Sequence, residues 1–124
     1  MSEFVFLFRS SEEDRREHMG TPERTQKTIQ SWLTWLRDLE AKGLVKSYGK
    51  PLETGGKVVR RKSVTDGPFA ETKDIVLGFI TVEAKDLREA ARIAQGCPFI
   101  VGEGSVEVRP VDVVRANERT TRAE

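Results

Sequence analysis

The sequence contains very little of the chemistry that builds disulfides, metal sites and imidazole-dependent catalysis. Its 124 residues include one cysteine, Cys97, and one histidine, His18. A single cysteine cannot form an internal disulfide, which fits a reducing compartment. Because this one His and one Cys have no paired spacing, the sequence lacks a recognisable zinc site, and we expect neither a metal nor another cofactor.

The sequence also lacks a long hydrophobic run and an excess of one charge. Its 21 basic and 20 acidic residues leave a net charge of +1, which gives no general attraction for a polyanion. No apolar run reaches the length of a membrane span, and the start, MSEFVFLF, is too short and too acidic for a secretory signal. We therefore expect a cytoplasmic protein that binds neither nucleic acid nor a membrane.

Apolar segments of strand length are present, and together they suit one domain with one core. Their β-branched and aromatic residues predict strands at residues 4–8, 44–48, 57–64, 75–82 and 105–109. The polar segment 10–20 has no apolar period and is expected to be a solvated surface loop. His18 lies in this segment, and we expect it to be solvated rather than catalytic.

Two helices are predicted from their end signals and apolar spacing. The first begins at Thr21, which can cap the free N–H groups, and ends at Gly43. Its apolar stripe consists of Ile29, Trp32, Leu33, Leu36 and Leu39, with Trp35 at the edge of the stripe. The second helix is capped by Asp86 and ends at Gly96.

This order of strands and helices predicts an α+β fold of the ferredoxin-like type, with an antiparallel sheet and two helices on one face. The domain is expected to cover residues 3–114, followed by a polar tail at 115–124. In the strands at 4–8 and 75–82, both alternating sets of side chains are largely apolar. Since the helices cover only one face, the second face predicts a homodimer that packs sheet to sheet.

The stretch VTDGPFAETKD, residues 64–74, precedes the most apolar strand. Asp66-Gly67 predicts a hairpin turn, and Phe69 is expected to anchor the loop in the core. A second interpretation stays open: the polar groups of Asp66, Glu71 and Lys73 line a ligand pocket, with Phe69 and Trp32 as its apolar part. Trp32 lies at helical spacing, so it also fits the core or an interface.

The same stretch, VTDGPFAETKD, resembles the signature of the DGPF-domain proteins, a branch of the YCII-related family. Other segments follow the family in the expected order: EFVFLFR, SWLTWLRDLEAKG, GKVV, VLGFITVEAKDLREAARIAQGCP and GSVEVRPV. The resemblance extends from about Glu3 to Val111 and implies a ferredoxin-like dimeric α/β barrel. Some family members are encoded next to extracytoplasmic-function sigma factors, so the resemblance implies a sigma factor as one candidate partner. A small-molecule ligand is the other partner that we expect.

The resemblance also implies where a catalytic His–Asp pair of the wider family would lie. The histidine position falls at residues 28–30, where this chain has no His, and the position before Pro98 is Cys97 instead of Asp. We therefore expect no catalytic residue and a non-catalytic binding or regulatory accessory module. The alternative is a cofactor-free enzyme that uses Asp66 and Lys73 at a cleft near the dimer interface.

Overall fold

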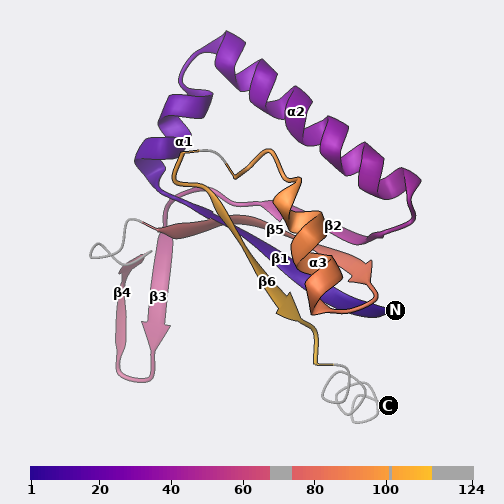
Figure 1. Ribbon diagram of the computed structural model, residues 1–124. Coiled ribbons are helices and arrows are strands. Elements are labelled where there is room, and N and C mark those ends of the chain that lie inside the picture. Colours follow the sequence, from indigo (N-terminus) through magenta and orange to yellow (C-terminus); the bar gives the residue numbers. More distant parts are fainter. Residues whose placement is uncertain (68–73, 101, 113–124) are drawn as a thin grey trace.

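The computed structural model of the chain describes residues 1–67, 74–100 and 102–112 (Figure 1). Its elements are β1 (Ser2–Ser10), α1 (Glu12–Met19), α2 (Pro22–Ala41), β2 (Val45–Pro51), β3 (Gly56–Arg60), β4 (Ser63–Gly67), β5 (Ile75–Ala84), α3 (Leu87–Gln95) and β6 (Ser105–Pro110). The strands β2, β5, β1 and β6 form one sheet in that order, and β3 pairs with β4 in a separate hairpin.

The main sheet confirms the predicted ferredoxin-like α+β fold. Strand β1 pairs antiparallel with both β5 and β6, and β2 pairs antiparallel with β5. The helices α2 and α3 pack on one face of this sheet, where their buried side chains join the same core. Their predicted caps are formed: the side chain of Thr21 accepts from the N–H of Arg24, and that of Asp86 from the N–H of Glu89.

The core is built on alternate residues of β1. Phe4, Phe6 and Phe8 are at most 3% exposed. They pack with Trp35 and Leu39 of α2 and with Ala90 and Ala94 of α3. The small alanines allow α3 to approach the sheet closely, while α2 fills its larger distance with an indole ring.

Helix α2 packs most of its predicted stripe on the core, since Trp32, Leu36 and Leu39 all contact it. The stripe differs in that Trp35, expected at the edge, is buried, whereas Ile29 and Leu33 are exposed. The Trp35 ring lies 6.4 Å from that of Phe6 and 6.3 Å from that of Phe8, measured between centroids. The helix is therefore rotated so that this indole ring faces the core.

The prediction of a solvated loop at residues 10–20 is wrong, because Glu12–Met19 form α1. The side chain of Ser11 caps this helix by accepting from the N–H of Asp14 at 2.9 Å. Acidic residues lie in its first turn and basic residues in its last, the order that the helix dipole favours. None of the α1 residues is buried, so the helix has no apolar period by which it could be recognised.

The sequence predicted a hairpin turn at Asp66-Gly67, but both residues lie in strand β4. The expected single strand at 57–64 is two strands that pair Val59 with Val64 and Lys57 with Asp66, which leaves residues 61–62 as the connection. Gly67 ends β4 for a packing reason, since a Cβ built there would lie 2.7 Å from Cγ2 of Val58. Glycine at this position thus permits close packing and does not form the turn.

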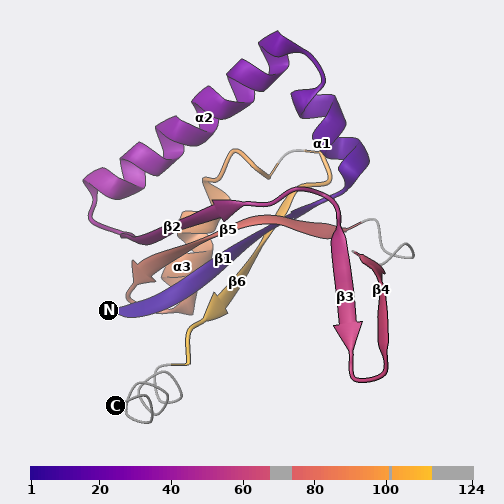
Figure 2. The same ribbon diagram turned by 180° about the vertical axis from the view of Figure 1, so that it is seen from behind.

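Within the described residues, no helix covers the second face of the sheet, which we call the open face. Figure 2 looks onto this face, and neither α2 nor α3 lies in front of it. It carries Val5 and Leu7 of β1, which stand opposite Thr81 and Phe79 of β5 in the antiparallel register. These strands therefore carry apolar side chains on both faces, as the sequence predicted. In the described part of the chain, helices cover only one of these faces.

Candidate functional site: a cleft beside the hairpin

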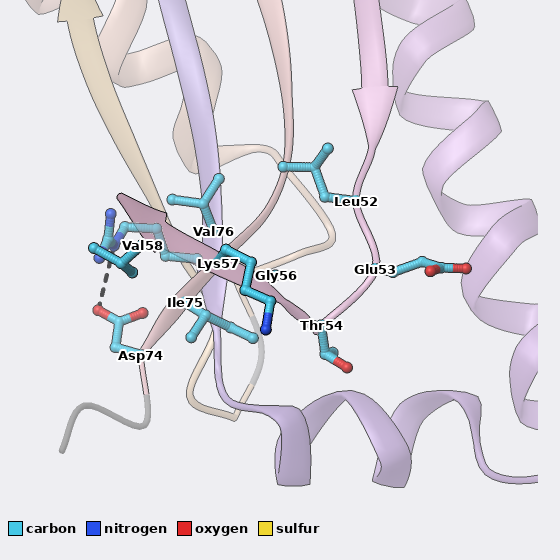
Figure 3. Close-up of a pocket in the computed structure, with 11 residues that line it drawn as sticks. Leu52, Glu53, Thr54, Gly56, Lys57, Val58, Asp74, Ile75 and Val76 are labelled. Carbon is cyan, nitrogen blue, oxygen red and sulfur yellow. Dashed lines mark hydrogen bonds and ion pairs between the residues drawn. The ribbon is translucent and has the colours of Figure 1, made fainter. Parts of the chain in front are cut away.

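A cleft of about 630 Å³ lies where the β3–β4 hairpin leaves the main sheet (Figure 3). It is formed by the end of β1, the start of β5, the start of β3 and the segment 52–55 that connects β2 to β3. We call it the hairpin cleft. A volume of this size matches the pockets that hold small organic ligands in proteins.

The walls of the hairpin cleft are largely apolar. Leu52, Val58, Ile75 and Val76 supply these walls. Leu52 is held in place because its N–H donates to the carbonyl of Leu77 at 2.9 Å. Such walls favour a ligand with an apolar part, because that part leaves water on binding.

The charged groups of the hairpin cleft are two cations and two carboxylates: Arg9, Lys57, Glu53 and Asp74. The guanidinium of Arg9 lies 3.4 Å from a carboxylate oxygen of Asp74 and 3.4 Å from one of Glu107. Because these formal charges balance, the cleft suits a neutral or zwitterionic ligand better than a polyanion. The fork of the Arg9 guanidinium offers directed donors to a carboxylate or carbonyl of such a ligand.

The residues that the sequence proposed for a pocket are not brought together here. Asp66 has a side chain that is 90% exposed and forms an ion pair with Lys57 of the adjacent strand, so it reaches the cleft only through Lys57. Trp32 packs edge-on against Phe8, with 4.7 Å between ring centroids, and does not line the cleft. Phe69, Glu71 and Lys73 lie outside the described residues.

Arg9 is a residue of the candidate site that the sequence did not predict. The strand predicted at residues 4–8 ended just before it. Its position supplies a signal, however, because it shares the alternating set of Val5 and Leu7 and therefore lies on the open face. An arginine that follows two apolar residues on the same strand face is a position where a charge needs a partner or a ligand.

A second polar region lies on the other face, around the carboxylate of Asp14. This Asp14 cluster contains Ser10, Ser11, Asp14, His18 and Glu103. The hydroxyl of Ser10 donates to Asp14 at 2.7 Å, and the backbone N–H of Glu103 donates to the other carboxylate oxygen at 3.4 Å. The hydroxyl of Ser11 donates to the Glu103 carboxylate. These bonds tie α1 to the segment that precedes β6.

His18 belongs to the Asp14 cluster and is only partly exposed. Its Nδ1 lies 2.9 Å from the backbone carbonyl of Asp14, which requires a proton on Nδ1, and 3.7 Å from the carboxylate of the same residue. The backbone carbonyl of His18 accepts from the hydroxyl of Thr28 on α2 at 3.0 Å. His18 was expected to be solvated, but it is partly buried and its hydrogen bonds connect α1 to α2.

Cys97 is buried in the core, two residues after the end of α3 at Gln95. Burial raises the pKa of the Cys97 thiol to about 12, which an N–H from Phe99 offsets only in part. A thiol with such a pKa is protonated at neutral pH and is a poor nucleophile. Cys97 thus behaves as a small apolar core residue.

Two further properties concern the whole described part of the chain. No helix within residues 1–67, 74–100 and 102–112 is long and apolar enough to cross a membrane. Within the same residues, no group of three or more His, Cys, Asp or Glu side chains is placed so that it could hold a metal ion.

Comparison with known proteins places these features in a family. A family model, the YCII-related domain, matches residues 3–115. An uncharacterized protein of Rhizobium meliloti (strain 1021) is 41% identical over 56 residues, which are 44% of this chain and 45% of the relative. The chain therefore spans less than half of that relative's length in this match. The family assignment rests on the match of the family model to residues 3–115.

Proposed function

Since this chain belongs to the YCII-related family, we propose that it is a cytoplasmic homodimeric accessory module that binds a small molecule and catalyses no reaction. The observation that carries the proposal is the hairpin cleft. Its walls are apolar and its charges are balanced, while its lining contains neither histidine nor cysteine. Such a lining can bind and orient a ligand, and among its described residues it offers no imidazole, the side chain that most often transfers protons in enzymes.

The ligand class follows from the same lining. Arg9 can receive a carboxylate, Glu53 or Asp74 can receive an ammonium group, and the apolar walls can hold a side chain between them. We propose zwitterionic amino acids with apolar side chains, or compounds of that shape and charge. A regulatory protein such as an extracytoplasmic-function sigma factor is the proposed reader of the bound state, in line with the resemblance noted above.

Support for the homodimer comes from the open face of the sheet. Val5, Leu7 and Phe79 lie side by side there and are partly exposed, so a partner would bury the rest of their apolar surface. Charged groups border this apolar centre: the Lys46 amine lies 3.6 Å from Glu83 and 3.9 Å from Glu3. An apolar centre with a polar rim is the usual composition of a protein interface.

The ligand proposal is tested by thermal unfolding with leucine, phenylalanine and tryptophan as free amino acids. A ligand at one hundred times its dissociation constant stabilises the folded state by about 2.7 kcal/mol, which appears as a higher unfolding temperature. Val58→Gln is expected to remove the effect because Val58 lines the cleft, and Thr65→Gln, its cross-strand neighbour, is the matched control. No shift with any of the three amino acids would reject this ligand class.

The homodimer is tested by sedimentation equilibrium at micromolar concentration. Leu7→Glu is expected to convert the dimer to a monomer because it places a charge in the centre of the open face. Leu33→Glu is the matched control, since Leu33 is an exposed leucine on α2, outside the sheet. A monomeric parent chain would reject the dimer, and dissociation by Leu33→Glu alone would move the interface to α2.

A further inference from the structure

The β3–β4 hairpin exposes an apolar pair that no described residue covers. Val59 is 73% exposed and Val64 is 64% exposed, and the two stand directly opposite each other in the antiparallel register. The adjacent pair on the same face is Lys57 and Asp66. The other face of β3 carries Val58, which lines the hairpin cleft. The hairpin thus presents Val58 to the cleft near its base and the Val59–Val64 pair to solvent.

The hairpin is attached to the rest of the chain mainly at its base. In both ribbon views it extends away from the main sheet, on the side opposite α2 (Figures 1 and 2). A two-stranded hairpin is only marginally stable in water, and it becomes stable when an apolar face packs on something else. The Val59–Val64 face is the apolar face that is available for such packing.

We propose that the hairpin is an arm that packs its Val59–Val64 face on a second copy of this chain. The inference rests on the homodimer proposed above and adds a second contact region to it. The base of the hairpin borders the open face, because the cleft between them is lined by Lys57 and Val58 on one side and by Arg9 and Val76 on the other. A dimer through the open face therefore brings the second copy next to the arm.

Charge complementarity also favours a second copy as the occupant. Arg61 and Lys62 form the exposed tip of the arm. Glu3 and Glu83 lie at the far end of the open face, opposite each other across β1 and β5, and share the single cation of Lys46. The basic tip and this acidic end carry opposite charges, so they would attract each other across a two-fold dimer.

The arm has a consequence for the ligand site. Because β3 supplies one wall of the hairpin cleft, a second copy that holds the arm also holds that wall. Ligand binding and dimerisation then favour each other, since each orders the same hairpin.

The test uses a photo-activated benzoylphenylalanine at position 59 of the full chain, in an equal mixture of unlabelled and heavy-nitrogen chains. Cross-linked peptides that combine both isotopes identify contacts between two copies. We expect such peptides from position 59, on the open face or near Glu83, and about tenfold fewer from position 65, which lies on the other face of the hairpin. Sedimentation of the same samples reports the oligomeric state.

The outcomes separate the arm from the dimer. A dimer without mixed-isotope peptides from position 59 overturns the arm and leaves the open-face dimer intact. A monomer overturns both. The double variant V59D/V64D is expected to weaken dimerisation about tenfold or more, against less than about twofold for T65D. Binding of a mixed-sequence DNA duplex that is lost in R61E/K62E, without mixed-isotope peptides, would instead make the hairpin a nucleic-acid ribbon and overturn the proposal.

Discussion

Arg9 and Ser10 are neighbours on β1, yet they supply polar groups to two regions on opposite faces of the sheet. Arg9 enters the hairpin cleft, where its carboxylate partners are surface residues and open volume remains beside it. Ser10 is buried and donates to Asp14, whose side chain is 12% exposed and whose partners are all groups of the same cluster. Because consecutive side chains of a strand point to opposite faces, Arg9 lies in the open hairpin cleft while Ser10 lies in the Asp14 cluster, which the protein's own side chains fill.

The two regions differ in what their polar groups bind: protein groups in the Asp14 cluster, and partly water in the hairpin cleft. In the Asp14 cluster, hydroxyl and backbone donors satisfy the carboxylate, and removal of the carboxylate leaves those donors unmatched. In the hairpin cleft, the charges are partly solvated, so water replaces a lost partner at little cost. We therefore expect substitutions in the cluster to change stability, and substitutions in the cleft to change binding.

The largest effect is expected for Asp14→Ala. The free energy of unfolding should fall by about 3 kcal/mol, because Ser10 and the N–H of Glu103 lose their acceptor in a partly buried position. Urea unfolding followed by circular dichroism measures the change. Glu13→Ala in the same helix is the control, since Glu13 is exposed, and it should change stability by less than about 0.5 kcal/mol. Equal losses in both variants would show that the cluster is not stabilising.

Gly102→Ala should destabilise the protein by about 2 kcal/mol. Gly102 has a φ of +54°, and a Cβ built on it would lie 2.4 Å from a carboxylate oxygen of Asp14. The left-handed backbone alone costs about 1 kcal/mol, and the clash adds the rest.

Gly43→Ala separates the two contributions to the Gly102 effect. Gly43 has a φ of +70°, but nothing lies within 4 Å of a Cβ built there, so its substitution should cost about 1 kcal/mol. The same urea measurements compare the two variants. If both glycines cost the same, the contact between Gly102 and Asp14 does not constrain the fold.

These two regions also show what sequence patterns could and could not predict. The strands of the main sheet and the helices α2 and α3 were predictable because their apolar residues recur with a period. Helix α1 was not, because it is held by a cap and by Glu103, which lies 92 residues from Ser11 along the chain. Gly67 was assigned to a turn, since a glycine needed for packing on Val58 looks the same in sequence as a glycine needed for a turn.

The sequence predicted the approximate location of the candidate site but not most of the residues that line it. The two described ends of the stretch 64–74 border the hairpin cleft, because Asp74 lines it and Gly67 pairs with Gly56 of the lining. The remaining lining comes from Arg9 and the segment 52–58, which are brought together by strand pairing over long distances in the sequence. Such pairing is fixed by the register of the sheet, and no local pattern of residues encodes it.

Arg9→Met should weaken binding while leaving the fold largely intact. The substitution removes the guanidinium from the cleft, and ligand affinity should fall about tenfold to a hundredfold, the value of one charged hydrogen bond. Stability should change by less than about 1 kcal/mol, because the carboxylate partners are exposed to solvent. Calorimetric titration with the amino acid that gives the largest thermal shift measures the affinity.

Arg109→Met is the matched control for Arg9→Met. Arg109 also pairs with Glu107, at 3.7 Å, but it does not line the cleft. Its substitution should leave ligand affinity unchanged. A loss of affinity in both variants would mean that Arg9 acts through Glu107 and does not contact the ligand.

The smallest effect is expected for Asp66→Ala, and it decides between a binding module and an enzyme. Asp66 forms an exposed ion pair with Lys57, so its loss should change the free energy of unfolding by less than about 0.5 kcal/mol. Lys57 keeps its place on β3, and ligand affinity should change by less than about threefold. Urea unfolding and calorimetric titration measure both quantities. If the folded variant instead lost a measurable turnover of any substrate, Asp66 would be catalytic, and the cleft would be an active site rather than a binding site.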